Sequence, residues 1–106
     1  LADAERGYFQ ELLRKAIARI EEIDGHIGPA IMPRRMNELT GVEQAILRVA
    51  VAELLERYDV PYRVVINEAV ELAKGFGTDQ GYRFVNAVLD RIAHEVRPDA
   101  ATHGQQ

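Results

Sequence analysis

Residues 59–93 decide the fold, and they read DVPYRVVINEAVELAKGFGTDQGYRFVNAVLDRIA. From Pro61 onward the apolar side chains recur every three or four residues, which is the spacing of one face of an α-helix. Gly75 and Gly77 interrupt this pattern, and glycine readily adopts the left-handed backbone that ends many helices. The same spacing then resumes. The stretch therefore predicts two amphipathic helices joined by a glycine-containing turn.

Each helix of this pair has a predicted core face. The first helix, at about 61–75, has an apolar side made of Tyr62, Val65, Ile66, Ala69, Leu72, Ala73 and Phe76. The second is predicted to be capped by Thr78, with Asp79 favouring its positive end, and to end at Arg97. Its buried stripe comprises Val85, Val88, Leu89, Ile92 and Val96. Four of these side chains are expected to anchor the core, namely Ile66, Leu72, Val85 and Leu89.

A third helix, at about 41–57, precedes this pair. Thr40 and Glu43 form the S/T-x-x-E pattern of a capping box directly before an apolar run. That run is apolar around most of its circumference, which is typical of a helix surrounded by other helices. We therefore predict that residues 41–57 form the central helix.

The sequence before Thr40 predicts one long helix followed by a connector. The helix spans residues 3–27, and Gly28 with Pro29 is predicted to end it. Its apolar face comprises Phe9, Leu12, Leu13, Ala16, Ile17, Ile20, Ile23 and Ile27.

The connector, residues 28–40, is expected to contain a short helical turn opened by Pro33. Arg34 and Arg35 are adjacent in it, and two arginines make a weak phosphate patch. We interpret them as residues of a solvated turn.

These patterns together predict an all-α helical bundle of about five helices. A chain of 106 residues has the size of one domain, and 47% hydrophobic with 28% charged residues is typical of a globular protein. We place the helical domain at residues 1–98, with 41–98 as its C-terminal subdomain. The polar residues 99–106 are predicted to form a disordered tail.

Composition also narrows the function. The absence of cysteine excludes disulfides, thiolate metal sites and cysteine nucleophiles, and it favours a reducing, cytoplasmic setting. The most apolar run, residues 45–55, is too short to span a bilayer. A net charge of −4 argues against binding of nucleic acid by bulk electrostatics, so such binding would be local or shared with a partner.

No catalytic or metal-binding constellation is visible. Glu68 and Glu71 share a helix face, but the Glu-x-x-His motifs of di-iron bundles are missing. The three histidines, His26, His94 and His103, have no metal-ligand spacing. We therefore expect no cofactor, no metal and no enzymatic activity.

Phe84 is the one residue whose position suggests binding. It is rotated by about 100° from its neighbour Val85, so it falls at the margin of the buried stripe. Tyr82 and Arg83 precede it in the first turn of the helix, and an aromatic ring with a guanidinium there can stack a splayed RNA base and hold a phosphate. The alternative is that Phe84 packs on the preceding helix beside Phe76, and the residues alone favour that packing role.

Two segments resemble a known family. INEAVELAK, residues 66–74, and FVNAVLD, residues 84–90, are similar in order and spacing to the C-terminal half of the NusB family of bacterial transcription antitermination factors. The resemblance extends back through GVEQAILRVAVAELL and, more loosely, RGYFQELLRKAI, and it reaches to about Pro98. The family usually has glycine in place of Ala87. The resemblance implies an all-α fold of two helical subdomains. This sequence begins at what resembles the third helix, so it would lack the family's first two helices and arginine-rich arm.

The resemblance also implies a function and a set of contacts. Members bind the boxA element of ribosomal-RNA leader transcripts together with NusE, a small-subunit ribosomal protein, within the RNA polymerase antitermination complex. Phe84 matches the family's aromatic RNA contact, and Arg83 matches a basic neighbour. Gln80 occupies the position of an acidic residue that modulates RNA affinity, and Asp79 beside it is expected in the same RNA-binding set. Glu43 matches an acidic residue at the NusE interface.

Two other functions stay open. The chain could be a helical dimerisation or protein-interaction module without an RNA role, in which the apolar face of residues 9–27 pairs with a second copy or rearranges. It could also be the NusB-like accessory domain of a ribosomal-RNA cytosine methyltransferase. We expect no catalytic domain after residue 106, which argues against this third function.

Overall fold

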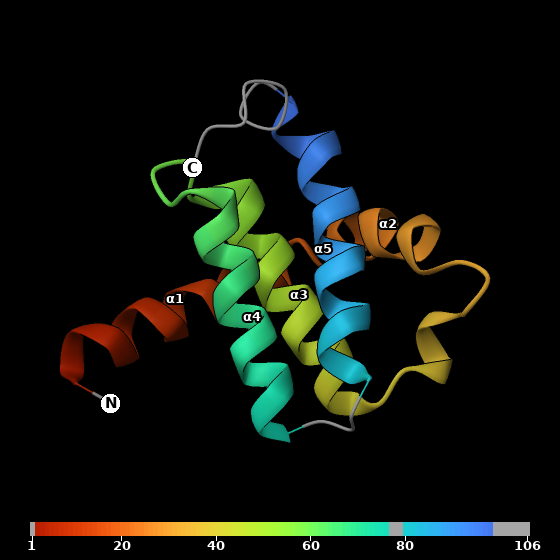
Figure 1. Ribbon diagram of the computed structural model, residues 1–106. Coiled ribbons are helices and arrows are strands. Elements are labelled where there is room, and N and C mark those ends of the chain that lie inside the picture. Colours follow the sequence, from red (N-terminus) through yellow and green to blue (C-terminus); the bar gives the residue numbers. More distant parts are fainter. Residues whose placement is uncertain (1, 77–79, 99–106) are drawn as a thin grey trace.

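The computed structural model describes residues 2–76 and 80–98 (Figure 1). These residues form five α-helices and one short 3₁₀ helix, with no strand among them: α1 (Asp3–Ala18), α2 (Ile20–Ile31), η1 (Met36–Glu38), α3 (Gly41–Glu56), α4 (Tyr62–Phe76) and α5 (Gly81–Val96). The all-α prediction is confirmed. The predicted cap at Thr78 and Asp79 and the predicted tail at 99–106 lie outside the described residues.

The central helix is α3, as predicted, because it packs against α1, α2, α4 and α5. Figure 1 shows it crossing the middle of the molecule behind α4 and α5. The predicted capping box fixes its start. The Thr40 hydroxyl accepts a hydrogen bond from the Glu43 N–H at 3.1 Å, and Glu43 Oε1 accepts one from the Thr40 N–H at 3.0 Å. Leu47, Val51 and Leu54 of α3 are fully buried, so this helix forms the middle of the core.

The helix pair predicted from residues 59–93 is α4 and α5, which pack on each other and on α3. Val85 and Leu89 of α5 are completely buried, and Ile66 of α4 is 5% exposed. These three predicted core anchors are confirmed. Residues that recur at helical spacing thus reach the core on both members of the pair.

The prediction that Leu72 is the fourth core anchor is wrong. Its side chain is 48% exposed, and Phe76, also predicted to pack inward, is 70% exposed. Both lie in the last turns of α4, where the small residue Ala73 is the one that is buried. Leu72 lies at the edge of the apolar face, about 100° from Ala73 around the helix, so the core contacts at this level go to Ala73.

The long helix predicted at 3–27 is also wrong, because the chain breaks at Arg19 between α1 and α2. Arg19 has φ −113° and ψ 26°, outside the helical range. Its guanidinium donates to both oxygens of Glu22, at 2.9 and 2.7 Å, and forms an ion pair with Glu56 of α3. The break allows the two helices to pack against different neighbours. Helix α1 packs mainly against α3, whereas α2 packs against both α3 and α5.

Gly28 and Pro29 do not end this segment either. The helix α2 continues to Ile31 with Pro29 inside its last turn. A proline there removes one backbone hydrogen bond. Ala30 and Ile31 beyond it are 8% and 3% exposed, and their burial offsets that loss. In the connector that follows, the predicted turn from Pro33 is reduced to the 3₁₀ helix η1.

The apolar face predicted for residues 9–27 is only half covered. Leu12, Ala16, Ile23 and Ile27 are buried. A second set lies outward, with Phe9 42%, Leu13 38%, Ile17 69% and Ile20 38% exposed, and we call these four residues the apolar row. A contiguous exposed row of this kind is typical of a surface that another chain segment covers.

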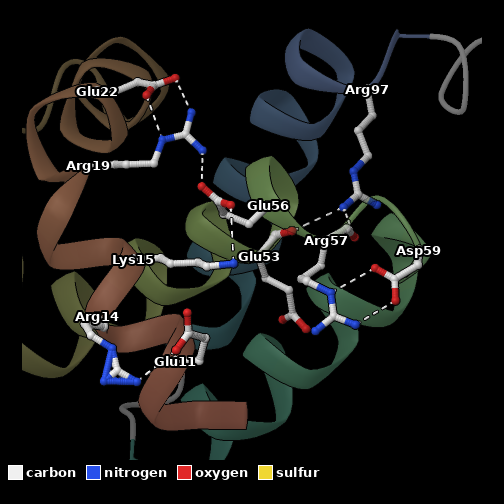
Figure 2. A network of polar contacts seen from close by, with 10 residues as sticks. All are labelled: Glu11, Arg14, Lys15, Arg19, Glu22, Glu53, Glu56, Arg57, Asp59 and Arg97. Carbon is white, nitrogen blue, oxygen red and sulfur yellow. Dashed lines mark hydrogen bonds and ion pairs between the residues drawn. The ribbon is translucent and has the colours of Figure 1, made fainter.

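A network of charged side chains ties the ends of the helices together (Figure 2). Lys15 of α1 lies 3.6 Å from Glu56 of α3. Arg57 and Asp59 form a two-pronged pair at 2.9 and 2.7 Å at the corner between α3 and α4. Arg97, just after α5, reaches back into the same corner, as Figure 2 shows. The polar contacts therefore hold α1, α3 and α5 at one end of the bundle.

Candidate nucleic-acid interface

The start of α5 places Phe84 at the margin of the core. Val85 beside it is fully buried, whereas Phe84 is partly buried and packs against the core cluster. Phe76, the neighbour considered for it from the sequence, is 70% exposed. Phe84 is therefore partly covered by the core and partly exposed.

The ring of Phe84 carries the guanidinium of Arg34 on its face. The Cζ atom of Arg34 lies 4.4 Å from the ring centroid, which is a cation–π contact. Arg34 comes from the connector between α2 and α3, far from Phe84 along the chain. Arg34 lies in an exposed turn, as expected, but it also makes this contact, which the sequence did not reveal. No local pattern could have revealed the contact, because the two residues meet only through the packing of α2 and α3 on α5.

Arg34 also approaches Glu43, in the first turn of α3. Its terminal nitrogen is 3.8 Å from Glu43 Oε1, with 42% of the arginine side chain and 16% of the glutamate side chain exposed. The same Oε1 accepts the hydrogen bond of the capping box. Glu43 is thus a mostly covered carboxylate that serves its own helix, with only a small part of its surface open to a partner.

A second aromatic and basic cluster surrounds Tyr82. Lys74 Nζ, from the end of α4, lies 5.2 Å from the centroid of the Tyr82 ring. Arg83 donates to the Tyr82 hydroxyl oxygen at 3.1 Å, and this hydrogen bond raises the pKa of the guanidinium above its usual value. Residues two apart on a helix do not face each other, so Tyr82 and Phe84 lie on different sides of α5.

The expected RNA-binding set is therefore only partly brought together. Phe84 pairs with Arg34 on one side of α5, and Arg83 turns toward Tyr82 on the other. Gln80 is exposed directly before the helix, and Asp79 lies outside the described residues. The arrangement offers aromatic faces and cations on both sides of one helix start, which suits a single strand that passes over it.

Other polar side chains make ion pairs within the fold. Arg48 of α3 donates to both oxygens of Asp24 at 2.9 Å each, which ties α3 to α2. Glu71 pairs with Lys74 at 3.5 Å, and burial raises the pKa of Glu68 above its usual value.

Across residues 2–76 and 80–98, no cluster of three or more histidine or carboxylate side chains could hold a metal ion. None of the helices in this described part has the length and apolar character needed to cross a membrane.

The fold and this surface define a small all-helical domain that presents aromatic rings and arginines at the start of its last helix. The chain belongs to the NusB family, whose model matches residues 1–94.

Curated relatives agree with this assignment. A protein of Edwardsiella ictaluri named transcription antitermination protein NusB is 48% identical over 97 residues, covering 92% of this chain and 69% of its own length. Proteins of the same name from Nitrosococcus oceani and Haemophilus influenzae are 52% and 51% identical over 88% and 84% of this chain. This chain covers 62% and 61% of their respective lengths, so it corresponds to somewhat less than two thirds of each.

Proposed function

We propose that this chain is a transcription antitermination factor that binds boxA-type single-stranded RNA of ribosomal-RNA leader transcripts together with NusE. The observation that carries the proposal is the identity of about half of all aligned residues to proteins named transcription antitermination protein NusB. On this proposal the chain is a binding protein and not an enzyme, and it works in the cytoplasm beside RNA polymerase.

The proposed RNA contact is centred on Phe84, with Arg83, Gln80 and Asp79 around it. An aromatic ring held against the core loses little freedom when a base stacks on it, and such stacking contributes about 1–3 kcal/mol per base. Two cations flank the same helix start, Arg83 on α5 and Lys74 on α4. They supply local positive charge on a chain whose net charge is −4.

The proposed contact with NusE is centred on Glu43. Its carboxylate lies in the first turn of α3, and Oε1 is shared between the capping hydrogen bond and Arg34. A cationic side chain of the partner would be the natural ligand for this group. Because Glu43 is mostly covered, we expect a single directed contact here and not a broad charged patch.

The apolar row on α1 and at the start of α2 is a further proposed interface, and we assign it to a second copy of the chain. In an antiparallel pairing centred on Leu13, Phe9 faces Ile17 of the other copy, so apolar residues meet apolar residues. Phe9, Leu13 and Ile17 would be withdrawn from water on both copies at once.

Fluorescence anisotropy tests the RNA proposal directly. A labelled RNA of boxA type is titrated with the chain alone and in the presence of NusE, and a shuffled RNA of the same composition is the control. We expect saturable binding that favours the boxA-type RNA and that strengthens when NusE is present. Binding of NusE without any RNA would identify a protein-interaction module instead. Equal binding of both RNAs would show that the contact is electrostatic only.

A further inference from the structure

Arg34 lies between the two residues to which the proposed function gives separate roles. Its guanidinium carbon is 4.4 Å from the centroid of the Phe84 ring, and its terminal nitrogen is 3.8 Å from Glu43 Oε1. Phe84 is the proposed RNA contact and Glu43 the proposed partner contact. A single side chain therefore touches both proposed surfaces.

The position of Arg34 makes it an RNA contact in its own right. Its guanidinium already covers a face of the Phe84 ring on which a base would stack. A planar guanidinium is itself a stacking surface for RNA bases, and it also binds phosphate in a forked geometry. Since 42% of the Arg34 side chain is exposed, a base or phosphate can reach it without displacing Phe84.

The charge of Glu43 restrains this guanidinium. The ion pair between them is long, at 3.8 Å, and such partly exposed pairs contribute little to stability. A cationic group of a partner can therefore take the place of Arg34 at Glu43 with little loss. Arg34 is then free to turn toward RNA. By linkage, RNA that engages Arg34 also leaves Glu43 more available to the partner.

We propose that Arg34 is a further RNA-binding residue, and that it couples the partner surface at Glu43 to the RNA surface at Phe84. This inference rests on the proposed function. It assigns the mechanism by which the two ligands strengthen each other's binding. The coupling passes through one side chain and requires no movement of the helices.

The test measures the dissociation constant of a boxA-type RNA, with and without saturating NusE, at one fixed salt concentration. The ratio of the two constants is the coupling factor. Arg34→Gln is compared with Arg35→Gln, which removes the same charge from the neighbouring exposed arginine. Glu43→Gln is compared with Glu38→Gln, and a glutamine at 43 keeps the acceptor that the capping box requires.

We expect a coupling factor of about fivefold or more in the unsubstituted chain. Arg34→Gln should weaken RNA binding and bring the factor close to one, whereas Arg35→Gln should leave the factor unchanged. Glu43→Gln should strengthen RNA binding without NusE more than Glu38→Gln does, and it should remove the gain from NusE. The inference is overturned if Arg34→Gln and Arg35→Gln have the same coupling factor.

The proposed function and the coupling role of Arg34 are rejected by different results. If the unsubstituted chain does not bind the RNA, or if Phe84→Ala binds it equally well, the proposed function fails and the inference falls with it. If Phe84→Ala weakens RNA binding and NusE still strengthens it in Arg34→Gln, the proposed function stands and only the coupling role of Arg34 is rejected.

Discussion

The Nε atom of Arg97 donates a hydrogen bond to the carbonyl oxygen of Leu54 at 3.1 Å, which fastens the end of α5 to the last turn of α3. The same guanidinium donates to the carbonyl oxygens of Val60 at 2.5 Å and Arg57 at 2.7 Å. Helix ends leave carbonyl groups without partners inside the helix. Arg97 is only 6% exposed, and its guanidinium donates the hydrogen bonds that these carbonyl groups need.

We expect Arg97→Met to lower the free energy of unfolding by about 2–4 kcal/mol, because several covered carbonyl groups lose a charged donor at once. Urea unfolding followed by circular dichroism measures this change. Arg14→Met is the control, since 69% of the Arg14 side chain is exposed and its pair with Glu11 lies on the surface. Equal stabilities for the two variants would show that Arg97 is dispensable for the corner.

We expect the contribution of Tyr8 to the stability of the fold to be lost at alkaline pH. Its hydroxyl donates to Glu53 Oε2 at 2.5 Å, and burial together with this glutamate raises the pKa of Tyr8 to about 12 from 10.0. The folded chain therefore holds the proton more tightly than the unfolded chain. The contribution is complete below pH 10 and declines as the pH rises toward 12.

Unfolding midpoints in urea from pH 8 to 12 should therefore fall more steeply for the unsubstituted chain than for Tyr8→Phe. The other tyrosines titrate in both proteins, so the difference between the two curves isolates Tyr8. Parallel curves would mean that the bond to Glu53 does not distinguish the protonated from the ionised phenol.

The capping box at α3 should be measurable as stability. Thr40→Ala removes the acceptor for the Glu43 N–H, and loss of such a cap costs about 1 kcal/mol. Thr40→Ser keeps the hydroxyl and should retain most of that stability. An equal loss in both variants would indicate that the methyl group of Thr40, not its hydroxyl, stabilises the helix start.

The apolar row should control association. Ile17, 69% exposed, lies in the row away from the core, so Ile17→Glu should leave the helix content intact while it opposes pairing of two copies. Sedimentation velocity over a range of concentrations should show a dimer for the unsubstituted chain and a monomer for the variant. A single monomeric species at every concentration for both chains would reject the second copy as the occupant of the row.

Features that depend on residues close together in the sequence could be predicted, whereas contacts between residues far apart in the sequence could not. Val85, Leu89 and Ile66 were assignable because their burial follows a local helical period. The capping box at Thr40 is likewise contained within four residues. The break at Arg19 was missed because the ion pair there involves Glu56, far along the chain.

The candidate interface followed the same rule. Phe84 stood out locally, as the aromatic residue at the edge of a stripe. Its partner Arg34 could not be found, since nothing in the connector indicates which helix lies beside it. Leu72 was misplaced for a related reason. Helical spacing gives the direction of a side chain but does not show where a neighbouring helix lies.

The most direct test of the central claim is the affinity of Phe84→Ala for a boxA-type RNA, measured by fluorescence anisotropy with NusE present. Tyr58→Ala is the control, because Tyr58 is a 66% exposed aromatic residue that contacts Arg97 at the other end of α5. We predict a loss of more than about 1 kcal/mol, or about fivefold in affinity, for Phe84→Ala alone, with its circular dichroism spectrum unchanged. Unchanged affinity in a folded Phe84→Ala variant would contradict the account.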